Sequence, residues 1–557
     1  MNATRRALVP IAALTLLLAL APLAAAPPAF TPTAVKQALV RRSAETITAA
    51  ELKDYLAFVA SDEMEGRASP SRGLDTTAKF IATMLSRAGV KPAGDNGTYF
   101  QKIVLKKEKI ALEGTEVELG GRRFVFGRDF IARPPAGSAS GAMVFAGDGW
   151  FVKSKNVDPY QEHDPKGKIV ILTSGALPQG LSYQEIMSGK RGEDWVDPVA
   201  YAQKKGAVGV ITLNSLLTQA NPDTMERIRR SAESGSFYPE KLPQMGGGQL
   251  PSITANLSLA SAIFAGEKTS VRTVMMSFPE GTPVKPFALA ADKKVQFSIK
   301  TSAETVDSQN VVAVVEGSDP ALKAEYVALG AHYDHTGTGT PINGDSIRNG
   351  ADDDGTGTVA LLAIAEALAK APRRPKRSVL FVWHMGEEMG LWGSQYFTTF
   401  PTVPIDKIVA QLNIDMIGRS KAEGDTNPRN KDLSGPNELY VIGSKMMSTE
   451  LGELSEAVND AYLKLSFNYK YDDPKDPEQF FYRSDHIHYA RKNIPIIFYF
   501  TGVHADYHQP SDEVSKIDFP KFERVTRAIY VTLWEIAEMK MRPRVDKELP
   551  AAARQGF

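Results

Sequence analysis

The stretch RSVLFVWHMGEEMG, residues 377 to 390, joins an apolar run to two adjacent glutamates. The run RSVLFVW has the composition of a strand that is buried on both faces of a sheet. Glu387 and Glu388 follow it closely, and adjacent carboxylates repel each other unless a partner offsets their charge. The stretch therefore predicts a buried strand that ends in two ionisable groups with different partners.

Comparable apolar segments recur after residue 305 and alternate with helical patterns. The expected strands cover 309–317, 325–335, 377–385, 407–417, 437–444 and 494–500, and the clearest expected helices cover 357–371 and 448–465. Such alternation is typical of an α/β fold with a largely parallel sheet. We expect a three-layer sandwich with a central mixed, largely parallel sheet, in which ligands bind at the carboxyl ends of the strands.

The chain before this region divides into three further segments. Residues 1–26 read as a signal peptide, because a charged start is followed by an apolar stretch and small residues at 24–26. An uncleaved membrane anchor is the alternative. Residues 47–130 form the N-terminal part of the main domain, with helical patterns over about 47–110, and residues 131–285 read as a small α/β insert. Residues 286–545 complete the main domain.

The composition limits the classes of function. The 557 residues include 65 Lys and Arg and 65 Asp and Glu, so the net charge is zero. A nucleic-acid-binding or polybasic membrane protein needs a basic excess, and neither class fits. The chain has no cysteine, so any metal site must use His, Asp and Glu side chains.

Seven of the eight histidines follow residue 331, in the expected α/β domain. In GAHYDH, His332 and Asp334 are two residues apart, so in an extended chain they face the same side. Asp334 could then accept the second N–H of the imidazole, as a carboxylate beside a metal-binding histidine does. A surface histidine with a chance acidic neighbour is the alternative.

Other ionisable groups also follow strands. The triplet at 352–354 has more carboxylates than helix capping requires, and Asp415 interrupts an apolar run, where a carboxylate needs a partner. The candidate ligands, each near a strand end, are His332, Asp353, Glu388, Asp415 and His508. Two histidines and three carboxylates, one of them bridging, suit a two-zinc site of the kind found in aminopeptidases and phosphatases.

The motifs GAHYDH, GADDDGTG, GEEMGLWGSQ, LNIDMIG and YHQPSDE occur in the order of a known family. The chain resembles the secreted di-zinc aminopeptidases of metallopeptidase family twenty-eight, which also includes glutamate carboxypeptidase and the transferrin receptor ectodomain. The stretches FVASDEMEGRASPSRG and KPAGDNGTYFQ are similar to its exported bacterial members. The resemblance implies that the insert is a protease-associated domain.

The resemblance also implies a role for each matching residue. His332 and Asp415 would bind one zinc ion, Glu388 and His508 would bind the other, and Asp353 would bridge the two. A cis peptide bond would follow the bridging residue.

Three further residues would support the chemistry. Glu387 would be the general base, Tyr507 the donor to the oxyanion, and Asp334 the partner of His332. His384, His486 and His488 are expected to have structural roles, and Asp352 to shape its loop. His504 is either a substrate contact or a loop histidine, and His163 and His335 are given no role.

These features predict an exported, periplasmic or secreted aminopeptidase that acts on peptides with a free N-terminus. We expect two zinc ions, no nucleic-acid partner and no integral membrane segment after signal cleavage. A glutamate-releasing carboxypeptidase is an alternative, but it needs a basic pocket, and Arg419 and Arg483 are two scattered bases. A single-zinc glutaminyl cyclase or a receptor-like binding module is disfavoured because all ligand positions are filled.

Overall fold

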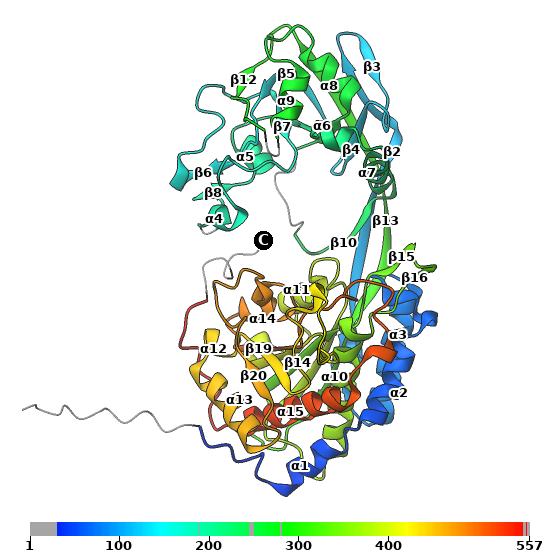
Figure 1. Ribbon diagram of the computed structural model, residues 1–557, viewed down its shortest axis with the longest axis vertical. Helices are drawn as coiled ribbons and strands as arrows, with labels where there is room; N and C mark the ends of the chain where they lie inside the picture. Colours follow the sequence, from blue (N-terminus) through cyan, green and yellow to red (C-terminus); the bar gives the residue numbers. More distant parts are fainter. Residues whose placement is uncertain (1–29, 188, 244–249, 279–280, 550–552, 554–557) are drawn as a thin grey trace, which may run out of the picture.

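The computed structural model describes residues 30–187, 189–243, 250–278, 281–549 and 553, so the expected signal peptide lies outside the described residues. Two α/β units lie at opposite ends of a long two-stranded ribbon (Figure 1). Among the described residues, no helix has both the length and the apolar character that a membrane crossing requires.

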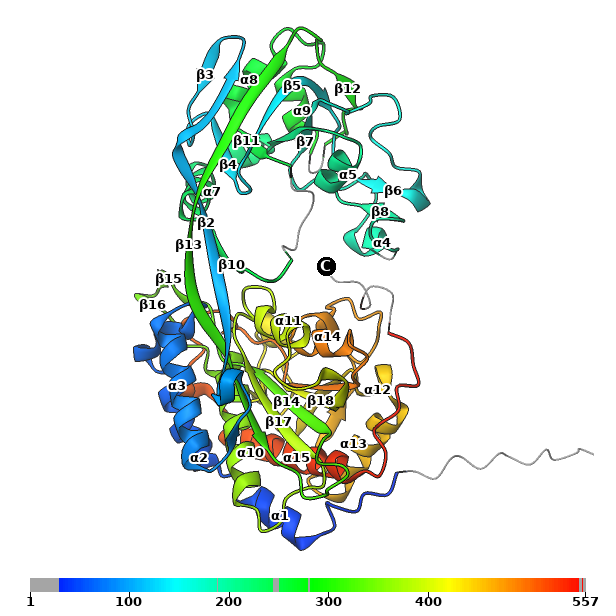
Figure 2. The ribbon, with the colours of Figure 1, turned by 180° about the vertical axis from the view of Figure 1, so that it is seen from behind.

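The ribbon consists of β2 (Phe100–Leu119) and β13 (Lys294–Val315), which run antiparallel. Phe100 pairs with Val311 at one end, and Leu119 pairs with Val295 at the other. The C-terminal end of β13, at 311–315, continues into the sheet of the larger unit. Its N-terminal end, at 294–299, pairs with a strand of the smaller unit. Both units are therefore built onto the same two strands, as the view from behind shows (Figure 2).

The larger unit contains a mixed sheet in the order β13–β17–β14–β18–β21–β19–β20. Its strands after β13 are β14 (Tyr326–His332), β17 (Ser378–His384), β18 (Ile408–Ile414), β19 (Glu438–Ile442), β20 (Ser466–Asn468) and β21 (Ile496–Phe500). The four strands β17, β14, β18 and β21 are parallel, whereas β13 is antiparallel to β17, and β19 is antiparallel to β21 and parallel to β20. The predicted largely parallel sheet is confirmed.

Helices cover both faces of this sheet. One face packs against α1 (Ala38–Glu45), α2 (Ala49–Val59), α3 (Arg72–Arg87), α10 (Gly357–Lys370), α13 (Thr449–Ala461) and α15 (Phe519–Glu538). The other packs against α11 (Trp392–Thr399), α12 (Ser444–Met447) and α14 (His486–Ala490). Strand β17 contributes Phe381 and Trp383 to the first layer and Leu380 and Val382 to the second. This alternation follows from the two-residue period of a strand and produces the expected three-layer sandwich.

The smaller unit has its own sheet. Its parallel strands are β5 (Gly137–Phe145), β7 (Ile169–Thr173), β9 (Gly209–Leu213) and β11 (Ser252–Ala255), with β4 (Phe130–Arg133) antiparallel at one edge. The helices α8 (Leu257–Phe264) and α9 (Val271–Met276) pack on one face, and α5 (Pro198–Lys204) packs on the other. Its core extends to Ile110 and Ile299, and so includes one end of the ribbon.

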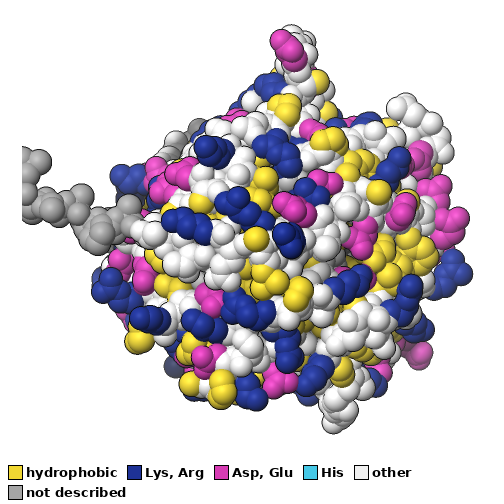
Figure 3. Space-filling view, turned by 90° about the horizontal axis from the view of Figure 1, so that it is seen from below, with side chains coloured by type: hydrophobic (Ala, Val, Ile, Leu, Met, Phe, Trp, Pro, Cys, Tyr) yellow, Lys and Arg dark blue, Asp and Glu magenta, His cyan; other side chains and the backbone are white. Residues whose placement is uncertain are grey.

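The surface carries charges of both signs. Figure 3 shows Lys and Arg side chains intermixed with Asp and Glu side chains over the end of the molecule that bears α1 and α15. This pattern agrees with the equal numbers of acidic and basic residues in the sequence.

The arrangement of the parallel strands determines where ligands can bind. Because β14, β17, β18 and β21 run in the same direction, their carboxyl ends lie at one edge of the sheet. The loops that follow these ends carry most of the residues singled out in the sequence.

Candidate metal centre

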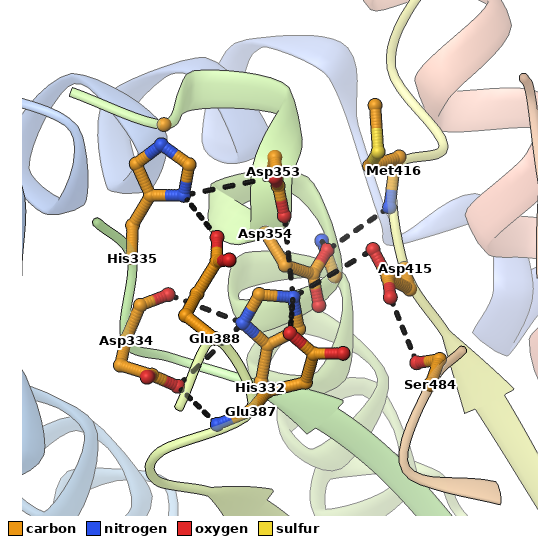
Figure 4. Close-up of polar contacts among 12 residues, drawn as sticks. His332, Asp334, His335, Asp353, Asp354, Glu387, Glu388, Asp415, Met416 and Ser484 are labelled. Carbon is orange, nitrogen blue, oxygen red and sulfur yellow. Dashed lines mark hydrogen bonds and ion pairs between the residues drawn. The ribbon is translucent and has the colours of Figure 1, made fainter. Parts of the chain in front are cut away.

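The five candidate ligands converge at the carboxyl edge of the sheet. Figure 4 shows four of them, His332, Asp353, Glu388 and Asp415. His332 is the last residue of β14, Glu388 lies in the turn after β17, and Asp415 follows β18. Asp353 lies in the turn that leads into α10, and His508 lies in the loop after β21. They form two groups that share Asp353.

The first group contains His332, Asp353 and Asp415. His332 Nε2 lies 3.3 Å from Asp353 Oδ1 and 3.7 Å from Asp415 Oδ1. On the other side of the ring, Nδ1 hydrogen-bonds to the backbone carbonyl of Asp334 at 3.1 Å. A carbonyl can only accept, so Nδ1 donates to it, and Nε2 is the ring nitrogen directed toward the carboxylates. Asp334 is thus the partner of His332, with its carbonyl closer than its carboxylate, which is 3.6 Å away.

The second group is built on the other oxygen of Asp353. Asp353 Oδ2 lies 3.1 Å from His508 Nε2, which lies 3.0 Å from Glu388 Oε2. One carboxylate therefore faces two separate groups of ligand atoms, with one oxygen in each. This is the arrangement expected of a bridging ligand between two cations.

Three buried atoms of the second group have no hydrogen-bond partner in the described part of the chain: Asp353 Oδ2, Glu388 Oε1 and His508 Nε2. Buried polar atoms are rarely left unsatisfied, and a group of them calls for an ion or other ligand. Imidazole nitrogen and carboxylate oxygen are donors that zinc accepts. The residues therefore fit a divalent cation.

The pKa shifts of the centre also indicate a site for a cation. Burial alone would lower the pKa of His508, but contacts with Asp353 and Glu388 raise that pKa to about 10. Burial raises the pKa of Asp415, although the neighbouring His332 opposes this effect. The carboxylates thus attract positive charge to the space between the ligands, and a bound cation would supply it.

Glu387 has surroundings different from those of Glu388. Its Oε2 lies 3.9 Å from His332 Nε2, while its backbone N–H donates to Asp334 Oδ1 at 3.1 Å. Burial raises the pKa of Glu387 well above its ordinary value, and the charge of His332 counteracts this rise. The two glutamates thus face different groups, as adjacent residues with opposite directions can.

A small pocket opens beside Glu387, Asp353 and Asp415. Its wall is mostly apolar and is formed by Met416, Phe480, Phe498, Phe500 and Val503, with Arg483 and Tyr507 completing it. The ring of Tyr507 stacks on His508 with centroids 3.8 Å apart. Burial raises the pKa of Tyr507, so its hydroxyl keeps its proton and can donate to a ligand in the pocket.

The outer aspartates of the triplet hold backbone rather than facing the ligand groups. Asp352 Oδ1 accepts from the N–H of Gly418 at 2.7 Å, and Asp354 Oδ1 accepts from the N–H of Met416 at 3.2 Å. Both bonds tie the turn to the loop after β18. The loop-shaping role expected for Asp352 is confirmed, and the peptide bond between Asp353 and Asp354 is cis, as the resemblance implies.

Ser69, in the N-terminal motif, joins two loops of the centre. Its hydroxyl donates to Asp334 Oδ2 at 3.1 Å and accepts from the N–H of Gly386 at 3.0 Å. The loop after β14 is thereby linked to the loop that carries Glu387. The sequence around Ser69 resembles a family motif, but it does not predict these two hydrogen bonds. They depend on the fold, which brings Asp334 and Gly386 to Ser69.

Arg67 lies completely buried beneath the same loops. Its guanidinium donates to the carbonyls of Tyr333, Asn349 and Gly350 at 2.7–3.0 Å, and to that of Val59 at 2.8 Å. These bonds hold the backbone on either side of the candidate ligands. The motif DEMEGR therefore supplies the support for the centre from residues almost three hundred positions away.

Four other histidines of the larger unit are buried near the centre but lie outside the two ligand groups. His486 bonds to the carbonyl of Phe481 and stacks on Phe498, and His384 bonds to the hydroxyl of Tyr489, so their expected structural roles are confirmed. His488 is buried, and so is His504, which lies 3.3 Å from Asp352 Oδ2. His504 is not among the described residues that line the pocket, so a substrate contact gains no support there.

His335, for which the sequence predicts no role, lies beside the candidate ligands. The structure places its Nδ1 in the second ligand group, 2.8 Å from Glu388 Oε1. The signal available in the sequence was its place beside Asp334, in the turn directly after a strand that ends in a ligand. That signal alone does not say which way the ring points.

The sequence profile of Peptidase family M28 matches residues 310–533. This part of the chain is a peptidase family M28 domain. The match runs through both ligand groups, from His332 to His508, and leaves the smaller unit outside it.

Relatives of the M28 domain carry peptidase names. Leucine aminopeptidase 2 of Trichophyton equinum is 26% identical over 318 residues, which cover 52% of this chain and 58% of the relative. Aminopeptidase Y of Saccharomyces cerevisiae is 28% identical over 275 residues, covering 47% and 45%. The chain thus spans about half the length of the curated relatives it matches. A solved aminopeptidase from Aneurinibacillus sp. strain AM-1 has a TM-score of 0.49 at 16% identity, over 91% of this chain and 97% of that one.

Arg67 provides a test of how the centre is supported. Replacing it in Arg67→Met leaves buried carbonyls without donors, and each costs about 1–3 kcal/mol, so we expect a loss of at least about 3 kcal/mol in the free energy of unfolding. Urea unfolding followed by circular dichroism measures this. Arg72→Met is the matched control, because Arg72 is exposed and pairs with Glu65 at the surface; it should change stability by less than about 0.5 kcal/mol. Equal stability of the two variants would contradict the supporting role of Arg67.

Proposed function

We propose that this chain is a zinc-dependent aminopeptidase that removes N-terminal residues from peptides. The observation that carries the proposal is the Asp353 carboxylate, which directs one oxygen to each of two ligand groups beside Glu387. Such a constellation is suited to metal-assisted hydrolysis with two ions. The names of the relatives, leucine aminopeptidase 2 and aminopeptidase Y, support the same activity.

Two zinc ions would be held by the two groups. His332 and Asp415 would hold one, Glu388 and His508 the other, and Asp353 both. When bound, zinc would lower the pKa of a water molecule toward neutrality and polarise the carbonyl of the scissile bond.

Glu387 would move the proton in this reaction. It lies beside the first group without being one of its ligands, and it lines the pocket. Its raised pKa suits a group that accepts a proton and then gives it up. It would take the proton of the attacking water and pass it to the leaving amine. Tyr507, which lines the same pocket and stays protonated, would donate a hydrogen bond to the oxygen of the scissile carbonyl.

The pocket would select the substrate. Its acidic end, with Glu387, Asp353 and Asp415, suits the free α-amine of a peptide, and its apolar wall suits the first side chain. A glutamate-releasing carboxypeptidase would need several bases to bind substrate carboxylates. Of the described residues that line this pocket, Arg483 alone is basic, which favours the aminopeptidase.

A receptor-like binding module and a single-zinc cyclase fit the centre less well. The binding module would be expected to have lost ligands, and the cyclase would need only one of the two groups. We propose export to the periplasm or medium on the basis of residues 1–26, and we propose that the smaller unit is a protease-associated domain.

The first test compares free and blocked substrates. We expect metal-replete protein to hydrolyse leucine p-nitroanilide and a leucine-initiated peptide, and to cleave their N-acetylated forms at least about 100-fold more slowly, because the α-amine contact is lost. Incubation with 1,10-phenanthroline should abolish the activity, and added zinc should restore it. Equal cleavage of the acetylated peptide would rule out an aminopeptidase, and release of glutamate from its C-terminus would favour the carboxypeptidase.

The second test separates the two glutamates. Glu387→Gln should lower kcat by about 10²–10⁴-fold, because the general base is lost, yet retain both metal ions. Glu388→Gln should lose one ion in measurements by inductively coupled plasma mass spectrometry. Glu453→Gln, at an exposed position on α13, is the control and should match the unmodified protein. Loss of an ion from the Glu387 variant would show that the two roles are reversed.

The third test concerns the apolar wall of the pocket. Leucine has three more carbons than alanine, and burial of each contributes about 0.8 kcal/mol, so kcat/KM should favour N-terminal leucine over alanine by roughly 50-fold. Aspartate at the N-terminus should be a poorer substrate than either. A preference for aspartate would instead assign the selecting contact to Arg483.

A further inference from the structure

We propose that His335 is a direct ligand, through Nδ1, of the metal ion held by Glu388 and His508. The inference rests on the proposed metal centre and adds an imidazole to one of its two groups. It would make the two ions unequal, since four side chains would hold one and three the other.

The position of the imidazole supports a direct contact. His335 Nδ1 lies 2.8 Å from Glu388 Oε1 and 3.7 Å from Asp353 Oδ2. One atom each from His335, Asp353, Glu388 and His508 lies within 4.8 Å of the others. Figure 4 shows the same ring nitrogen directed toward both carboxylates.

The missing hydrogen bonds argue against a purely supporting role. His335 is 1% exposed, yet neither of its ring nitrogens, nor Glu388 Oε1, forms a hydrogen bond with any residue that the structure describes. At 2.8 Å a bond between Nδ1 and this oxygen would be short enough, so its absence means that the alignment is poor. A cation in the second group would lie between this nitrogen and this oxygen and would satisfy both atoms.

The backbone holds the ring in this orientation. The His335 N–H donates to the carbonyl of Arg67, whose guanidinium binds the carbonyl of Gly350. A Cβ at Gly350 would lie 2.5 Å from Cγ of the His335 ring, and the residue has a φ of +57°. The glycine therefore allows the backbone to lie directly against the imidazole, and this contact limits where the ring can lie.

With His335 as a fourth ligand, the second group would fill all four coordination positions of a zinc ion. The first group, with three ligands, would leave one position free. Zinc with four protein ligands is typical of tightly held ions, whereas three protein ligands leave a position for water or substrate. Glu387 lies beside the first group, 3.9 Å from His332 Nε2. The open position would then be next to the general base, and the second ion would bind more tightly than the first.

The test uses the full chain, freed of metal by chelation and titrated with zinc alone. We expect the unmodified protein to bind one ion at least about tenfold more tightly than the other, and His335→Ala to lose that difference. X-ray absorption at one equivalent of zinc decides between ligand and support. Two imidazoles should surround the tight ion in the unmodified protein and one in the variant, whereas His486→Ala, which removes an equally buried ring outside the groups, should retain two.

A measurement on the unmodified protein covers the case in which the variant does not fold. With cadmium-113 bound and histidines labelled with nitrogen-15, scalar coupling should appear to three imidazoles rather than two. Two coupled imidazoles at two bound ions, or an unchanged imidazole count in His335→Ala, would overturn the inference and leave the proposed function intact. Failure of the unmodified protein to bind zinc would overturn both.

Discussion

The centre depends on the need to balance buried negative charge. Asp334, Asp353, Asp354, Glu387 and Asp415 are crowded at one edge of the sheet, where water cannot screen their repulsion. The chain balances part of this charge with imidazoles and with a guanidinium buried below. The remaining negative charge faces the two ligand groups, where cations would bind. The metal centre and the stability of the surrounding loops therefore depend on the same buried charges.

The aspartate triplet shows how neighbouring residues of one type can act differently. Asp352 and Asp354 use their oxygens as acceptors for backbone N–H groups of the loop after β18. They hold that loop, and with it Asp415, against the turn. The middle residue is left free to direct both oxygens toward the ligand groups. Glu387 and Glu388 divide in the same way, because the backbone direction changes between them.

Much of the fold and the main ligands could be predicted from the sequence. Continuous apolar strands alternate with helices, and a polar residue near the end of such a strand must find a partner, which identified His332 and Asp415. Arg67, Ser69 and His335 could not be predicted in this way. The first two lie far from the centre in sequence, and the direction of the His335 ring depends on the close approach of Gly350. These are consequences of tertiary packing, which no local pattern contains.

The shared ribbon also constrains the order in which the chain can fold during synthesis. Strand β2 leaves the ribosome early, but its partner β13 follows only after the smaller unit has been made. The sheet of the larger unit then continues from β13, through pairing with β17. Long-range pairing of this kind is slow to form. An N-terminal fragment that ends before β13 therefore lacks the strand that joins the two units, and β13 is synthesised before the parallel strands that carry the metal-binding edge.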